Sequence, residues 1–199
     1  MEAVVDLGVW AAVQVGLAQY QPYLVGSTDK TRAAVAVVLG PTPEGLQLLF
    51  IERALHPDDP WSGHIAFPGG RIEADDPSPR AAAERETLEE VGLDLSGAEY
   101  WGRVDDLTGH MLPVVVSGFV YRLEKPTPLT LNHEIESAFW AGADQLRDPS
   151  KRTQYRLQRR GEEQAFPALD LLGPNRPVLW GLTFRIVRQL VAWMEPDKA

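Results

Sequence analysis

The nine residues from Arg85 to Leu93, with the sequence RETLEEVGL, place three glutamates within five consecutive positions. A helix advances about 100° and ~1.5 Å per residue, so Glu86 and Glu90 lie one turn apart on the same face, with Glu89 beside them. Like charges at this spacing repel each other, which favours a bound cation that neutralises them. Carboxylate oxygens are ligands that Mg²⁺ and Mn²⁺ prefer. The pattern therefore predicts a helix with a metal-binding face.

Both ends of this helix can be predicted from the residues around it. Ser78 followed by Pro79 is typical of an N-cap and a first turn, although Asp76 could start the helix two residues earlier. Gly92 can supply the left-handed residue that commonly closes a helix. The residues expected to pack inward, opposite the glutamates, are Thr87, Leu88 and Val91.

The segment from Gly70 to Leu93 resembles the Nudix box, the motif of the Nudix hydrolase family. The family pattern is a glycine, five residues, a glutamate, seven residues, and then R-E-U-x-E-E-x-G-U, in which U is a bulky apolar residue. The matching residues are Arg85, Glu86, Glu89, Glu90, Gly92 and Leu93. One residue is inserted before Arg85, so that Pro77 stands where the first glutamate would fall. The structural role of that glutamate then passes to Glu73, Asp75 or Asp76.

Two further segments resemble the coenzyme A diphosphatase branch of the same family. An apolar stretch from Leu48 to Arg53 is followed by G-x-x-x-F-P-G-G at residues 63–70. The second segment, Leu179 to Thr183, carries W-G-L-T. The inserted residue and the acidic Glu73 after the glycine pair are also similar to this branch. Together, the similar segments extend from about residue 33 to about residue 190.

The resemblance implies a metal-dependent enzyme that splits coenzyme A or acyl-CoA into 4′-phosphopantetheine, or its acylated form, and adenosine 3′,5′-bisphosphate. A first alternative is the same chemistry on another nucleoside diphosphate derivative, such as an NDP-sugar, ADP-ribose, NADH or a dinucleotide polyphosphate. A second alternative is a non-catalytic ligand sensor with the same fold. The presence of Glu86, Glu89 and Glu90 argues against the sensor, because such a protein would be free to lose them.

The resemblance also assigns roles to individual residues. The implied ligands of Mg²⁺ or Mn²⁺ are Glu86, Glu89, Glu90 and the carbonyl group of Gly69. Catalytic roles fall on Glu89 as ligand or base, on Glu134 as an alternative base, and on Arg85, which holds a glutamate or forms a structural salt bridge. The residues expected to contact the substrate are Arg53, Trp61, His64 and Arg152. Trp61 stands where it could stack on an adenine, whereas His56, His133 and Glu136 are weaker candidates.

The 199 residues, 44% of them hydrophobic, suit one domain with a single core rather than two domains. We expect an α+β Nudix fold: an α/β/α sandwich with a mixed sheet and a loop-helix-loop box. Residues 1–30 would be an N-terminal helical extension, and residues 31–195 the core. Strands are expected at 31–39, 46–53, 100–104, 112–123 and 136–140, helices at 141–149 and 177–194, and a loop-rich insertion at 150–168. Residues near 65–67 are expected to lead into the glycine pair.

Charge and composition restrict the partners. The net charge of −9 argues against nucleic acid and anionic membranes, but not against a phosphorylated, nucleotide-derived small molecule. The segment 147–160 has six basic residues against Asp148 alone, and could hold a peripheral phosphate or simply be solvated. The chain has no cysteine, which excludes disulfides and thiolate chemistry.

The apolar run from Leu7 to Ala18 is too short to span a bilayer and is unlike a signal peptide. It is expected to pack on the domain or on a partner subunit, which makes a homodimer possible, and a cytoplasmic location is expected.

Overall fold

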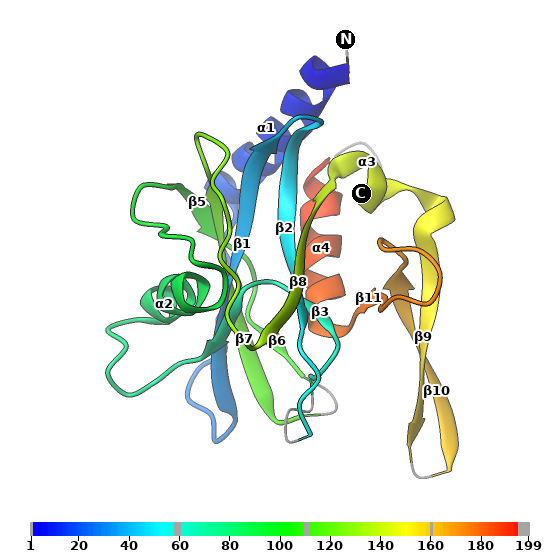
Figure 1. The fold of residues 1–199 in the computed structure, drawn as a ribbon. Helices are drawn as coiled ribbons and strands as arrows, with labels where there is room; N and C mark the ends of the chain where they lie inside the picture. The colour runs from blue at the N-terminus through cyan, green and yellow to red at the C-terminus, as the bar shows by residue number, and fades with distance from the viewer. Residues whose placement is uncertain (1, 58–60, 110–111, 160, 195–199) are drawn as a thin grey trace.

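The computed structural model describes residues 2–57, 61–109, 112–159 and 161–194, and in it a mixed sheet separates two layers of helices (Figure 1). The central sheet has eight strands in the order β3-β2-β1-β7-β5, while β4, β6 and β8 pair with β1, β7 and β2. β1 runs parallel to β7 and antiparallel to β2. The predicted α+β sandwich with a mixed sheet is confirmed.

The helices and strands have the following bounds. The helices are α1 Glu2–Gln19, α2 Pro79–Val91, α3 Ala143–Arg147 and α4 Gly181–Met194, with a 3₁₀ turn at Pro149–Lys151. The strands of the central sheet are β1 Thr31–Thr42, β2 Gly45–Arg53, β3 Ile65–Ala66, β4 Gly69–Arg71, β5 Glu99–Arg103, β6 Leu107–Thr108, β7 Val114–Arg122 and β8 Ile135–Gly142. A second sheet of three strands contains β9 Arg152–Arg159, β10 Glu162–Leu169 and β11 Leu179–Trp180.

The two faces of the central sheet are buried under different helices. Because side chains alternate along a strand, Val37 and Leu39 of β1 point toward α1 and α4, whereas Ala34 and Ala36 point toward α2. The side chains on the α2 face of β1 are small, and α2 presents alanines in return, so helix and sheet can approach closely. This close approach brings the glutamates of α2 next to the glycine pair of β4.

The ends of α2 agree with the sequence. Ser78 is the N-cap, and its hydroxyl oxygen accepts a hydrogen bond from the Ala81 amide over 3.1 Å. Gly92 closes the helix in the left-handed conformation, with φ of 68°. Thr87 and Val91 are buried as predicted, but Leu88 is 51% exposed. The prediction for Leu88 was wrong because the helix buries the face that carries Glu90, not the full arc opposite the glutamates.

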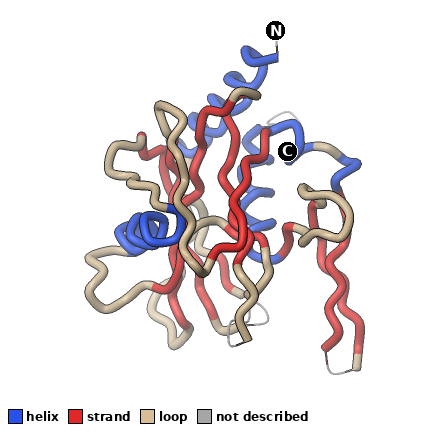
Figure 2. The backbone as a smooth tube through the Cα atoms, viewed as in Figure 1, coloured by secondary structure: helices blue, strands red, loops and turns tan. Residues whose placement is uncertain are grey.

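The predicted loop-rich insertion at 150–168 is instead a β-hairpin formed by β9 and β10 (Figure 2). Gly161, with φ of 82°, lies in the turn between the two strands. Most of the hairpin side chains are exposed, so the sequence has little of the apolar alternation that identifies a half-buried strand. The prediction failed because the hairpin is anchored by a few contacts, made by Tyr155 and Phe166 near the middle of the strands and by the buried Ala168 and Leu169 at the base.

Two other boundaries also differ from the prediction. The C-terminal helix begins at Gly181 rather than at residue 177, because Leu179 and Trp180 extend along β10 as the strand β11. The predicted helix at 141–149 is shorter, since residues 141 and 142 still belong to β8. The short strands β3, β4 and β6 were not predicted, because strands of two or three residues have no recognisable period in the sequence.

The N-terminal helix α1 packs on the same face as α4. Trp10, Val13 and Leu17 are buried in the shared core, and the Trp10 indole N–H donates to the Leu46 carbonyl oxygen over 2.7 Å. Gly16 lies against the ring of Trp193 in α4. None of the described helices is both long enough and apolar enough to cross a membrane.

Candidate active site

The acidic face of α2 meets the strand β4 at the glycine pair Gly69 and Gly70. Glu90 is 2% exposed, and its Oε2 accepts a hydrogen bond from the Gly69 amide over 2.8 Å. Its other oxygen, Oε1, accepts from the Arg53 guanidinium over 3.1 Å. Both carboxylate oxygens of Glu90 therefore accept a hydrogen bond, one from β4 and one from β2.

Burial controls the protonation of Glu90. Removal from water raises the pKa of its carboxyl group to about 7, and the nearby charges of Glu86 and Glu134 act in the same direction. The hydrogen bond from Gly69 and the charge of Arg53 oppose this rise only in part. A cation bound at this carboxylate would lower the pKa again, because it favours the ionised form.

Glu86 lies one turn earlier, directly against Gly70. A Cβ atom at position 70 would overlap the Glu86 carboxylate, so only glycine leaves room for it there. The pKa of Glu86 is also raised, first by burial and then by the charges of Glu89 and Glu134, while Arg85 opposes the shift. Glu86, Glu89, Glu90 and Glu134 therefore form one acidic cluster around the glycine pair.

Arg85 holds several of these groups together. Its Nε and Nη2 donate to Asp76 over 3.0 Å each, and its Nη1 donates to Glu86 over 2.9 Å and to Glu89 over 3.2 Å. These hydrogen bonds and charges raise the pKa of Arg85 and lower that of Asp76. Of the three acidic residues considered for the first glutamate of the box, Asp76 is the one that contacts Arg85. Glu73 and Asp75 are exposed.

The two candidates for the base are more accessible to solvent than the other glutamates. The side chain of Glu89 is 55% exposed and that of Glu134 is 51% exposed. Arg53 lies between Glu134, at 3.8 Å, and Glu90, so it links the loop before β8 to the box helix. The structure brings both candidates to the cluster.

The donor set fits a divalent cation. Four carboxylates lie near Arg53 and Arg85, and burial, together with the repulsion between the carboxylates, raises the pKa values of Glu86 and Glu90. Within the described residues, no three acidic or histidine side chains already converge on a single point, because the oxygens of Glu86 and Glu90 are held by Arg85, Arg53 and Gly69. Cation binding would therefore exchange some of these contacts. For Gly69 the structure shows the amide donating to Glu90, and a role for its carbonyl group stays a prediction.

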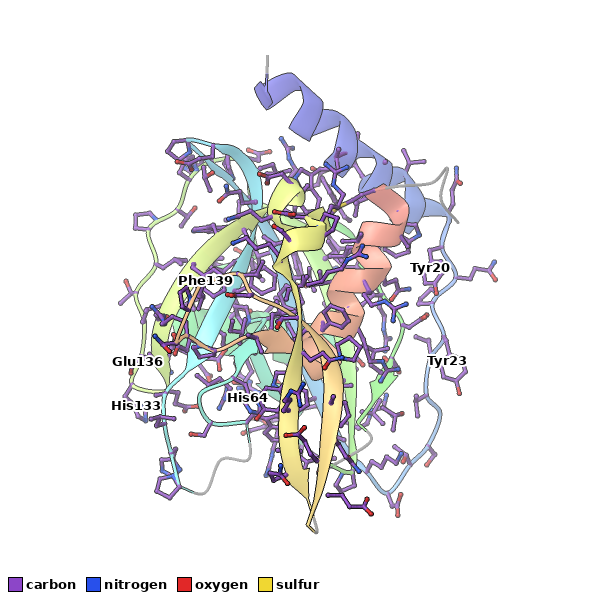
Figure 3. All side chains as sticks on the ribbon, turned by 90° about the vertical axis from the view of Figure 1, so that its right-hand side faces the viewer. Tyr20, Tyr23, His64, His133, Glu136 and Phe139 are labelled. Atoms are coloured by element: carbon purple, nitrogen blue, oxygen red, sulfur yellow. The ribbon has the colours of Figure 1, made fainter. Side chains whose placement is uncertain are left out.

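The predicted substrate residues are not all brought to this cluster. His64 lies under the β9–β10 hairpin (Figure 3), with its ring edge-on to Trp180 at 5.2 Å and to Tyr155 at 5.9 Å. Its carbonyl oxygen accepts from the Arg53 amide over 3.0 Å, so it supports the strand that carries Arg53. Trp61 is half-buried one turn before His64. His133 and Glu136, also labelled in Figure 3, are exposed.

Arg152, the fourth predicted substrate residue, does not lie at the acidic cluster. It lines a groove formed by α3, α4, β9 and β10, and those helices cover the face of the sheet opposite α2. Its predicted contact with the substrate stays a prediction.

Sequence reasoning missed a contact beside Arg53. Glu52 Oε2 accepts from Arg176 over 2.7 Å and from the Ser137 hydroxyl over 2.9 Å. Arg176 is 124 residues away from Glu52 and lies in a loop, so no local pattern could have identified the pair. Trp180 belongs to the W-G-L-T segment, so the sequence did point to this residue. Its stacking on Tyr155, with the ring centroids 3.9 Å apart, was not predicted.

Comparison with known proteins agrees with this geometry. Residues 29–160 match the model of the NUDIX domain. An uncharacterized protein of Schizosaccharomyces pombe is 31% identical over 165 residues, covering 71% of this chain and 50% of that protein. Nudix hydrolase 15, mitochondrial, of Arabidopsis thaliana is 30% identical over 160 residues, covering 78% of this chain and 56% of the relative. The chain thus spans about half the length of these relatives.

A solved structure is similar over almost the whole chain. The MutT/nudix family protein from Enterococcus faecalis aligns with a TM-score of 0.55 at 18% identity, covering 98% of this chain and 70% of that one. At this identity the likeness concerns the fold alone. The match to the domain model, which includes the acidic helix and the glycine pair, shows that this chain belongs to the Nudix family.

Proposed function

We propose that this chain is a metal-dependent hydrolase that cleaves the diphosphate linkage of a nucleoside diphosphate derivative. The observation that carries the proposal is the acidic cluster: Glu90 is buried with a pKa of about 7, and Glu86 is seated on Gly70, where a side chain would displace it. A fold that keeps such a repulsive arrangement gains from a cation. The Arabidopsis relative is named a Nudix hydrolase, which supports the same activity.

The residues of the acidic cluster would have three roles: metal ligand, general base and positioning of the ligands. Glu86 and Glu90 would hold Mg²⁺ or Mn²⁺, with Glu89 and the Gly69 carbonyl as further ligands. The bound metal would neutralise the diphosphate oxygens and favour ionisation of the attacking water. Glu89 or Glu134 would accept the proton of that water, since both are exposed enough to reach it. Arg85 would position Glu86 and Glu89 through the contacts described above.

Within this class we propose coenzyme A or acyl-CoA as the substrate. The support is the resemblance of residues 48–70 and 179–183 to the coenzyme A diphosphatase branch. In the structure these segments lie beside each other, because Trp180 contacts His64 of the G-x-x-x-F-P-G-G motif. The proposal includes a cytoplasmic location and a homodimer.

The experiment is product analysis by mass spectrometry after incubation with Mg²⁺ and coenzyme A, with ADP-ribose, NADH, NDP-sugars and dinucleotide polyphosphates in parallel. Preferential release of 4′-phosphopantetheine supports the substrate. Hydrolysis of another compound alone keeps the activity and rejects coenzyme A. No hydrolysis of any compound with Mg²⁺, or with Mn²⁺ in its place, rejects the enzyme and favours the ligand sensor.

The same assay distinguishes the two candidate bases. A base that is not a ligand should leave Mg²⁺ affinity unchanged when replaced by glutamine, while kcat falls by about 10²-fold or more. We therefore compare Glu134→Gln with Glu89→Gln, measuring kcat and the Mg²⁺ concentration for half-maximal rate. Unchanged rates in both variants would reject the catalytic roles of both residues.

A further inference from the structure

A groove on the α4 side of the molecule is not used by the proposed hydrolytic reaction. It has a volume of about 460 Å³ and lies between α3, α4 and the base of the β9–β10 hairpin. Its lining is mainly apolar, with Leu146, Leu169, Phe184, Val187 and Val191 among its residues. A volume of this size falls in the range of small-molecule sites, roughly 300–1,000 Å³.

The charged residues that line the groove are all basic. They are Arg152 and Arg188, which come from two different elements, β9 and α4. Both side chains are exposed, and neither forms an ion pair or a side-chain hydrogen bond with the described residues. Arg156, on the same strand as Arg152, differs in this respect, since it pairs with Glu163 over 2.6 Å.

The basic lining of the groove contrasts with the chain's net charge of −9. Two unpaired guanidinium groups above an apolar floor offer bidentate hydrogen bonds to one anionic group and contact area to an apolar chain. Among the lining residues no carboxylate competes for the arginines. A purely apolar ligand would leave both charges unused, and a small inorganic anion would leave the floor exposed to water.

We propose that this groove binds a free, single-chain anionic amphiphile, with its carboxylate or phosphate head between Arg152 and Arg188 and its apolar chain along Val187, Val191 and Leu169. The groove lies on the face of the sheet opposite α2, so this site is separate from the acidic cluster (Figure 1). The proposal gives one residue of the basic segment 147–160 a specific role, namely Arg152, the first residue of β9.

The test is isothermal titration of the full chain with decyl phosphate and with decanoate, each below its micellar concentration. We expect saturable binding of one molecule per chain. Inorganic phosphate has the anionic group without the apolar chain, and decanol has the chain without the charge. Each should bind at least tenfold more weakly. Arg152→Gln/Arg188→Gln should lower the affinity by tenfold or more, and Arg156→Gln, which removes the same kind of charge from the same strand, should leave it within twofold.

A second variant tests the apolar part of the site. Ala192 is exposed at the groove, so Ala192→Trp should fill it without disturbing the core and should also lower the affinity by tenfold or more. Circular dichroism and the melting temperature would check that each variant is folded. The proposal is overturned by equal losses in Arg156→Gln and the double variant, by decanol binding as tightly as decyl phosphate, or by binding to phosphatidic acid vesicles without binding to either free amphiphile.

Discussion

At the scale of single residues, the contact between Gly70 and Glu86 decides whether the acidic cluster can form. The backbone of Gly70 is not in the left-handed region, so the position requires glycine for space and not for conformation. We expect Gly70→Ala to push the Glu86 carboxylate away from β4 at little cost in stability, because this carboxylate is the far end of a flexible side chain. Metal-dependent hydrolysis should fall at least tenfold.

Gly97→Ala is the matched control, because Gly97 is exposed and has nothing within 4 Å of an added Cβ atom. Urea denaturation and initial rates measured on both variants separate the two positions. Similar behaviour of Gly70→Ala and Gly97→Ala would mean that Glu86 does not need its place against β4.

The raised pKa of Glu90 makes a prediction for stability against pH. In the unfolded chain the carboxyl group titrates near its ordinary value of about 4.5, and in the folded protein near 7. Because the folded pKa is the higher one, the stabilising contribution is fully present below pH 4.5 and is lost as the pH rises through 7. The shift corresponds to about 3 kcal/mol between these limits.

The measurement is the free energy of unfolding of the metal-free protein, by urea, from pH 5 to pH 8. Glu90→Gln cannot titrate, so its curve should fall less steeply than that of the unmodified chain. Glu86 titrates in both proteins, and its charge contributes to the shift of Glu90, so the difference between the two curves reports Glu90 together with this coupling. Parallel curves would show that burial does not raise the pKa of Glu90 in the folded protein.

The sequence predicted the residues of α2 more completely than those of the loop before it. The helical spacing of Glu86, Glu89 and Glu90 follows from their numbers alone, because a helix has one geometry. The choice of Asp76 over Glu73 and Asp75 as the partner of Arg85 depends on the path of a loop, which has no period. Glu134 could be proposed only by resemblance, because 44 residues separate it from Glu90 and the sheet brings them together.

At the scale of elements, the same contrast separates α2 from the β9–β10 hairpin. α2 carries its own signals, a serine cap, a proline in the first turn and a closing glycine, and these were confirmed. The hairpin depends on partners far away in the sequence: Trp180 stacks on Tyr155, and His64 lies against both rings. Local pattern cannot show such a contact, so the segment resembled a loop.

The stack therefore makes a prediction about the hairpin. Tyr155→Ala removes the ring that packs on Trp180, and aromatic pairs contribute about 0.5–1.5 kcal/mol beyond the area they bury. We expect β9 and β10 to exchange their amide hydrogens at least fivefold faster, since a two-stranded ribbon is only marginally stable alone. Hydrogen exchange with mass spectrometry measures this segment by segment.

Gln154→Ala is the control, because Gln154 is the exposed neighbour that points to the other side of the strand. Exchange in α2 should be unchanged in both variants. Equal exchange of the hairpin in Tyr155→Ala and in the unmodified chain would mean that the aromatic contact does not hold the hairpin.

At the scale of the whole molecule, the central sheet connects the site to the rest of the fold. Adjacent residues of β2 serve its two sides: Arg53 reaches Glu90 of α2, and Glu52 reaches Arg176 in the loop before β11. A ligand that binds the acidic cluster therefore also stabilises strands whose side chains pack into the apolar cores on both faces of the sheet. We expect metal binding to stabilise the fold as one unit and not only the box helix.

Mg²⁺ should therefore raise the melting temperature of the chain. A ligand that binds only the folded form adds about 2.7 kcal/mol at a concentration of 100 times its Kd, and for a domain of this size each kcal/mol corresponds to roughly 2–4 °C. Addition of EDTA should reverse the rise. Glu86→Gln and Glu90→Gln should each lose most of it, because they remove the carboxylates against the glycine pair. Glu124→Gln, an exposed carboxylate between β7 and β8, should keep it in full. If all three variants respond to Mg²⁺ like the unmodified chain, the ion binds elsewhere, and the acidic cluster must be balanced by Arg53 and Arg85 alone.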